Sequence, residues 1–181
     1  IGTQNSYFGT SAAYNQLESN HQVAIGYEAL KGSSTASQNT GSDNLAIGYQ
    51  AGLVNSSGGS NSFVGPNSGY SNTSGYNNAF VGYNSGWSNV TGGYNAFFGY
   101  AAGDTNISGD SNIAIGGLAD VATDSTTNAI AIGYGAIAAS NEFALPDSIT
   151  NWKFQGDSYT LPTSDGGANY VLSTDGSHGM F

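Results

Sequence analysis

The sequence predicts an all-β protein built as a parallel β-solenoid, or β-roll, of about eight coils, and three observations predict it. A glycine-centred motif returns every 17 residues along most of the chain. Each repeat holds one short run of β-branched or aromatic residues between asparagine and glycine, which is typical of a strand. A unit of this length is too short to include a helix, so we expect one coil of a solenoid per repeat.

The repeat glycines define the register, and positions within a repeat are numbered here from that glycine as position 0. Six of the seven intervals between these glycines are 17 residues long, and the interval between Gly26 and Gly48 is 22. Five residues within Ser33–Thr40 are extra there, and we expect them to bulge from one corner of the solenoid. The repeat glycines are Gly9, Gly26, Gly48, Gly65, Gly82, Gly99, Gly116 and Gly133.

Positions −4 to −1 are the expected strands, over residues 5–8, 22–25, 44–47, 61–64, 78–81, 95–98, 112–115 and 129–132. The first position of these runs is usually asparagine, which tolerates left-handed backbone and can form a hydrogen-bonded ladder at a corner. Glycine at position 0 permits the turn that follows. The ladder asparagines include Asn44, Asn61, Asn78, Asn95 and Asn112.

Positions −3 and −2 exchange volume from coil to coil. Where position −2 is alanine, position −3 is large, and where position −2 is aromatic, position −3 is serine or alanine. Successive strand residues face opposite sides, so we expect Phe63, Phe80 and Phe97 to form one stack, with Ala46 and Ala114 at its two ends.

A strand that is apolar on both sides is buried on both sides. One side can fill the interior of the coil, but a coil of this length is too thin to cover the other side. We therefore predict self-association along the rod, as a homotrimer.

We predict two regions, a repeat region over 1–140 and a β-rich cap or shaft segment over 141–181. Proline and tryptophan appear in the second region, and Phe143–Leu145, Trp152–Phe154 and Tyr170–Leu172 are its expected strands. Pro-Asp, Gly-Asp and Asp-Gly pairs between them indicate turns.

Composition excludes several classes of function. Lys and Arg together number 2 against 12 acidic residues, for a net charge of −10, which disfavours binding to nucleic acid or to anionic membranes. No apolar run is long enough to cross a bilayer, and the absence of cysteine excludes disulfides and thiolate metal sites. We expect no cofactor and no bound metal.

No catalytic constellation is apparent, so we expect a protein that is not an enzyme. His21 and His178 have no carboxylate or thiol at ligand spacing, and we expect His21 to be solvated. The Asp-Gly pairs at Asp165 and Asp175 are interpreted as turns rather than calcium ligands. Asn-x-Ser/Thr sequons begin at Asn55, Asn72, Asn89 and Asn106, and a polar corner explains them more simply than glycosylation.

The aromatic residues are the remaining candidates for recognition, because tyrosine and tryptophan combine an apolar face with a polar edge. Trp87, at position +5 beside Tyr70 of the preceding coil, is the best candidate contact for a glycan or receptor; packing against its neighbours is an equally open alternative. The tyrosines at position +1 are expected to form ladders.

The repeat motif and the C-terminal segment resemble those of two protein families. Gln22–Gly26 and Asn128–Gly133 resemble the repeats in the heads of YadA-type trimeric autotransporter adhesins, which are parallel β-rolls with shorter repeat spacing. The unit Asn44–Gly52 is more similar to repeats of phage tail fibres. Tyr159–Gly166 and Val171–Gly176 resemble the LPTxDG…VLxTDG segment of such fibres, and this resemblance covers nearly the whole chain.

The resemblance implies a structural and adhesive fibre segment of a phage tail fibre, in the virion or otherwise extracellular. Its implied partners are two further copies of itself and a host cell-surface polysaccharide or protein, with threefold avidity strengthening weak contacts. A bacterial cell-surface trimeric adhesin and a self-assembling extracellular filament subunit are the alternatives. A polysaccharide-cleaving tailspike is disfavoured because residues 56–103 contain no carboxylate side chain for glycoside hydrolysis.

Overall fold

The structure is a computed structural model that describes residues 3–16, 18–35, 39–146, 151–154 and 157–160. The chain divides into two compact units, Ile1–Pro146 and Asp147–Phe181. Every regular element in the described residues is a strand, so the predicted all-β class is confirmed.

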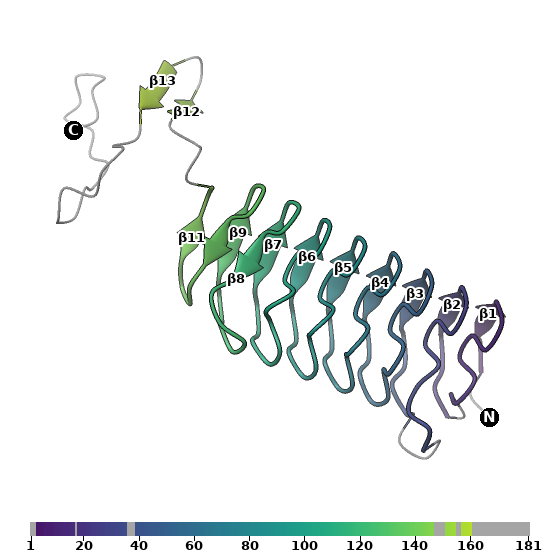
Figure 1. Cartoon of the computed structure of the whole chain (residues 1–181). Coiled ribbons are helices and arrows are strands. Elements are labelled where there is room, and N and C mark those ends of the chain that lie inside the picture. The colour runs from purple at the N-terminus through teal and green to yellow at the C-terminus, as the bar shows by residue number, and fades with distance from the viewer. Residues whose placement is uncertain (1–2, 17, 36–38, 147–150, 155–156, 161–181) are drawn as a thin grey trace. The chain divides into compact units, whose positions relative to one another are not determined.

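The first unit is a parallel β-solenoid, as the repeat spacing predicts. Its main sheet has nine strands in the order β1-β2-β3-β4-β5-β6-β7-β9-β11, and every neighbouring pair is parallel (Figure 1). The strands are β1 Ser6–Phe8, β2 Val23–Ile25, β3 Leu45–Ile47, β4 Ser62–Val64, β5 Ala79–Val81, β6 Ala96–Phe98, β7 Ile113–Ile115, β9 Ile130–Ile132 and β11 Phe143–Ala144.

Equivalent repeat positions lie opposite one another throughout this sheet, even across the longer coil. Val23 is paired with Leu45, and Ile25 with Ile47, although 22 residues separate the members of each pair. The extra residues therefore leave the strand register unchanged. The inserted segment ends at Asn39, which is fully buried and whose Nδ2 donates to the Asn15 carbonyl at 2.9 Å. Residues 36–38 lie outside the described part of the chain.

The glycine at position 0 is required by both its backbone conformation and its neighbours. Gly65 has φ of +126°, a conformation that side chains disfavour. A Cβ on Gly65 would lie 2.6 Å from the carbonyl oxygen of Gly82 in the next coil. The coils therefore approach one another too closely at this corner for any other residue.

Position −2 faces the interior of the solenoid. Ala46, Phe63, Phe80, Phe97 and Ala114 are all fully buried there. The ring centroids of Phe63 and Phe80 are 5.6 Å apart, and those of Phe80 and Phe97 are 4.9 Å apart with the planes at 4°. The aromatic stack with alanine at each end is thus present as predicted.

Glycine at position +4 makes room for the rings of this stack, a contact that the sequence did not suggest. Position −3 points outward, whereas position +4 in these coils lies against the rings at position −2. A Cβ on Gly52 would lie 2.6 Å from Cδ2 of Phe63, so glycine here makes room for the ring. In the coil of Ala24, by contrast, position +4 holds the fully buried Leu30.

Two asparagine ladders complete the interior, one at position −4 and one at position +7. The side-chain amides of Asn44 and Asn55 both donate to the Gly58 carbonyl at 2.8 Å. The Oδ1 atom of Asn44 accepts from the backbone N–H of Asn61 in the next coil at 2.9 Å, and the Nδ2 atom of Asn72 donates to Oδ1 of Asn55 at 2.7 Å. The amides of these asparagines are thereby satisfied by groups of their own and adjacent coils, whereas the buried Oε1 of Gln22 at position −4 accepts no hydrogen bond from the described residues.

The C-terminal part of the solenoid departs from the simple repeat. Two short strands, β8 Asp120–Val121 and β10 Ile137–Ala138, form an additional parallel pair. Strand β11 falls within the predicted 141–181 segment, yet it pairs with β9 and extends the main sheet.

The second unit contains an antiparallel pair, β12 Asn151–Phe154 and β13 Asp157–Thr160. Strand β12 includes the run predicted at Trp152–Phe154. The strand predicted at Tyr170–Leu172 lies outside the described residues.

Candidate functional site

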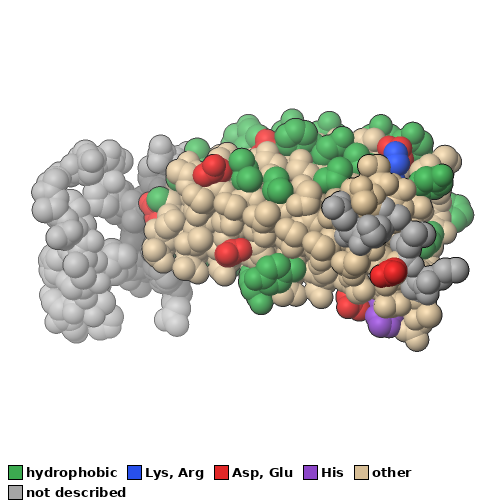
Figure 2. All heavy atoms as spheres, turned by 90° about the horizontal axis from the view of Figure 1, so that it is seen from below, with side chains coloured by type: hydrophobic (Ala, Val, Ile, Leu, Met, Phe, Trp, Pro, Cys, Tyr) green, Lys and Arg blue, Asp and Glu red, His purple; other side chains and the backbone are tan. Residues whose placement is uncertain are grey.

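The outward side of the main sheet is an uncharged apolar face. Side chains at positions −3 and −1 point away from the interior, and those at −1 remain 37–42% exposed at Ile25, Ile47, Phe98, Ile115 and Ile132. Positions −3, −1, 0 and +1 contain no charged residue in any of the eight repeats. Figure 2 shows hydrophobic side chains gathered along one side of the solenoid and a smaller separate group on the opposite side.

Tyrosine stacks border this outward face at position +1, as predicted. The rings of Tyr27 and Tyr49 stack with centroids 5.5 Å apart, and those of Tyr83 and Tyr100 with centroids 5.7 Å apart. Pro66 occupies this position between the two pairs. These four rings are about half exposed, so they widen the apolar face rather than fill the core.

The pair proposed for recognition, Tyr70 and Trp87, is brought together at position +5. Their ring centroids are 5.7 Å apart and their planes differ by 21°. Trp87 is 41% exposed. Trp87 therefore packs against Tyr70 and also remains partly exposed to solvent. The repeat places Leu53 one coil before Tyr70 and Asp104 one coil after Trp87 at the same position.

Asp104 is a residue that the sequence reasoning did not select. The Ser88 hydroxyl lies 3.5 Å from its Oδ1 atom. Burial raises the pKa of Asp104 above its usual value, and the nearby carboxylate of Asp120 raises it further. Asp120 itself accepts hydrogen bonds from the backbone N–H and hydroxyl of Thr105, the latter at 2.7 Å. The 17-residue period could have identified Asp104, because it places this carboxylate one coil after Trp87 at the same position +5.

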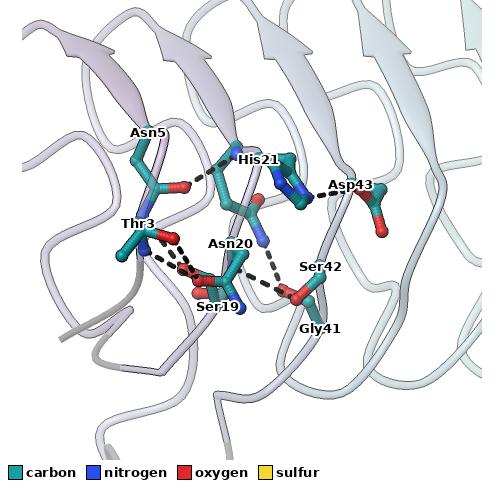
Figure 3. Close-up of polar contacts among 9 residues, drawn as sticks. Thr3, Asn5, Ser19, Asn20, His21, Gly41, Ser42 and Asp43 are labelled. Carbon is teal, nitrogen blue, oxygen red and sulfur yellow. Dashed lines mark hydrogen bonds and ion pairs between the residues drawn. The ribbon is translucent and has the colours of Figure 1, made fainter.

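The prediction that His21 has no nearby carboxylate is wrong. His21 Nδ1 lies 3.0 Å from Oδ1 of Asp43. Figure 3 shows the two side chains pointing toward each other. Both residues occupy position −5, and the longer coil between them obscures that equivalence in the sequence. The two side chains are 55% and 59% exposed, so the prediction of a solvated histidine is confirmed. An exposed pair of this kind contributes little to stability.

The four sequon asparagines form the interior ladder at position +7. All are at most 1% exposed, and their side-chain nitrogens are engaged in the ladder or its carbonyl contacts. Their amides are therefore inaccessible in the folded solenoid, which supports the interpretation as a structural corner.

The described residues contain no group of three or more His, Asp or Glu placed to hold a metal ion. They also contain no helix capable of crossing a membrane. Comparisons with family models, curated proteins and solved structures found no match to this chain. The geometry thus offers two surfaces to interpret, the outward apolar face and the aromatic pair beside Asp104.

Proposed function

We propose that this chain is a structural and adhesive fibre segment of a phage tail fibre, acting outside the cell or on the virion. In this proposal three copies associate along the outward apolar face, and the assembly attaches to polysaccharide or protein on a host surface. The observation that carries the proposal is the uncharged face itself, which runs the length of the solenoid.

The size of that face suits association. Nine strands at about 4.8 Å spacing span about 38 Å, and five residues from −3 to +1 span about 16 Å, for an area of about 600 Å². This lies at the upper end of the apolar patches found on monomers, which reach about 600 Å². Stable interfaces bury about 800 Å² per partner, so this face with its polar margin approaches that size.

A matched pair of isoleucines tests the association. Ile115 at position −1 is 42% exposed on the outward sheet face, whereas Ile107 at position +8 is 41% exposed elsewhere on the coil. We expect wild-type protein to sediment as a trimer at micromolar concentration. Ile115→Glu should convert it to smaller species, because a charge would be desolvated in the interface. Ile107→Glu should remain trimeric.

A wild-type protein that sediments as a folded monomer would refute the proposed assembly. Equal effects of Ile115→Glu and Ile107→Glu would show that association does not use the sheet face. The same surface would serve a cell-surface adhesin, so the neighbouring genes provide the distinguishing observation. Virion genes favour a tail fibre, and a downstream coiled coil with a membrane anchor favours an adhesin.

A further inference from the structure

The aromatic stack at position +5 ends at Trp87. One face of the indole therefore has no aromatic ring packed against it. Tyr70 stacks on one side, with centroids 5.7 Å apart. On the other side the next coil places Asp104 at the same position, and among the described residues the indole has no second ring partner. Coils repeat at about 4.8 Å, so the carboxylate lies about one coil beyond the indole.

Asp104 retains hydrogen-bonding capacity toward this space. A carboxylate can accept about four hydrogen bonds, whereas the described residues supply only the long contact from Ser88 at 3.5 Å. The carboxyl is partly buried and has Asp120 nearby, which together raise its pKa. Hydrogen-bond donors from a ligand would stabilise its ionised form.

The charge of the protein restricts the ligand. No basic residue occurs between Lys31 and Lys153, and the net charge of the chain is −10. Acidic sugars and phosphorylated glycans are therefore repelled from this surface. A neutral pyranose fits both the indole of Trp87 and the carboxylate of Asp104. It presents an apolar face of C–H bonds to the indole and hydroxyl donors at its edge to the carboxylate.

We propose that Trp87 and Asp104 together bind a neutral pyranose unit of a surface polysaccharide. The sugar ring stacks on the free face of the indole, and its hydroxyls donate to the Asp104 carboxylate. This inference rests on the proposed adhesive function and assigns it a ligand class. Repetition of the site in a trimer would let weak individual contacts act together.

Affinity electrophoresis tests the site with defined probes. We would measure retardation in gels containing dextran, mannan or galactan as neutral polysaccharides, with alginate as the acidic probe and chitosan as the amino probe. We expect at least one neutral polysaccharide to retard the wild-type protein and alginate not to retard it. Trp87→Ala should weaken the apparent affinity about tenfold or more, as for a central aromatic contact, and Trp87→Phe should recover part of it.

Asp104→Ala should weaken the same interaction while leaving the fold intact, since its side chain is only partly buried. The matched control is Tyr14→Ala. Tyr14 also occupies position +5 and is 73% exposed, but Lys31 follows it one coil later and the described residues give it no stacked ring. Its replacement should leave retardation unchanged. Thermal melting of each variant would verify folding.

No retardation by any of the three neutral polysaccharides would overturn the proposal, as would equal retardation of wild type and Trp87→Ala. A larger effect of Trp87→Ala on retardation by chitosan than on retardation by the neutral probes would overturn the assignment of a neutral sugar. Sedimentation of the same samples separates the two hypotheses. A trimer without retardation refutes only the sugar site, whereas a monomer with Trp87-dependent retardation refutes only the trimeric fibre.

Discussion

Replacing Phe80 by alanine is the sharpest test of the interior packing. Phe80 is fully buried, with the rings of Phe63 and Phe97 at centroid distances of 5.6 and 4.9 Å. The coils above and below are fixed by backbone hydrogen bonds, so they cannot collapse into the space. A cavity held open in this way costs about 3–5 kcal/mol per chain for Phe→Ala.

For a domain of this size, each kcal/mol corresponds to about 2–4 °C in melting temperature, so Phe80→Ala should lower it by roughly 6–20 °C. Phe80→Leu should cost less, because it retains much of the volume. Asn84→Ala is the control for the same coil, since Asn84 is only partly buried. Its φ of +55° adds a penalty of about 1–2 kcal/mol. Equal melting temperatures for Phe80→Ala and Asn84→Ala would refute the packing argument.

Three further predictions concern the asparagine ladder, the inserted segment and Asp104. Asn72→Ala should destabilise the solenoid by about 1–3 kcal/mol in denaturant unfolding, because it leaves buried ladder partners unsatisfied; a loss below about 0.5 kcal/mol would contradict the ladder's importance. Deleting Ser34–Gln38 while keeping Asn39 should change stability by less than about 1 kcal/mol, and loss of folding would show that the insertion is structural. Because the folded-state pKa of Asp104 is raised, its ionisation opposes folding, so Asp104→Asn should raise the melting temperature near neutral pH. That gain should vanish as pH falls through the raised pKa and below the ordinary value of 3.8, and a gain independent of pH would contradict the assignment.

The period made the strands and the interior ladders predictable. Once Gly65 and Gly82 are recognised as equivalent, Phe63 and Phe80 must occupy equivalent places in adjacent coils. Asn61 and Asn78 follow in the same way. These inferences require only that each repeat forms one coil, and the strand pairing of the structure satisfies that condition.

The turns were less predictable, because spacing alone does not reveal which turn residues point inward. Position +4 holds Leu30 in one coil and Gly52 in the next, and the sequence offers no strand-like alternation there. The contact between glycine at position +4 and the phenylalanine rings at position −2 therefore emerged only from the structure. The contact of His21 with Asp43 was missed for a different reason, since the 22-residue interval concealed their shared position.

The apolar outward face is not a requirement of the solenoid itself. Position +9 also points outward, and in the four coils from Gly48 to Gly99 it holds the exposed hydroxyl residues Ser57, Ser74, Thr91 and Ser108. Position −1 is equally regular, yet every occupant is large and apolar. A solitary solenoid could place serine or threonine at both positions, as antiparallel sheets do on their solvated side.

The difference between positions −1 and +9 shows that the coil itself does not require large apolar side chains on its outward side. Hydroxyl side chains at −1 would leave the interior rows, the asparagine ladders and the backbone pairing unchanged, because none of these uses the outward side chains. Large apolar side chains there instead expose surface whose burial is worth about 25 cal/mol per Å². That free energy is gained only when another surface covers the face, which is the physical basis for proposing that this solenoid acts as part of an assembly.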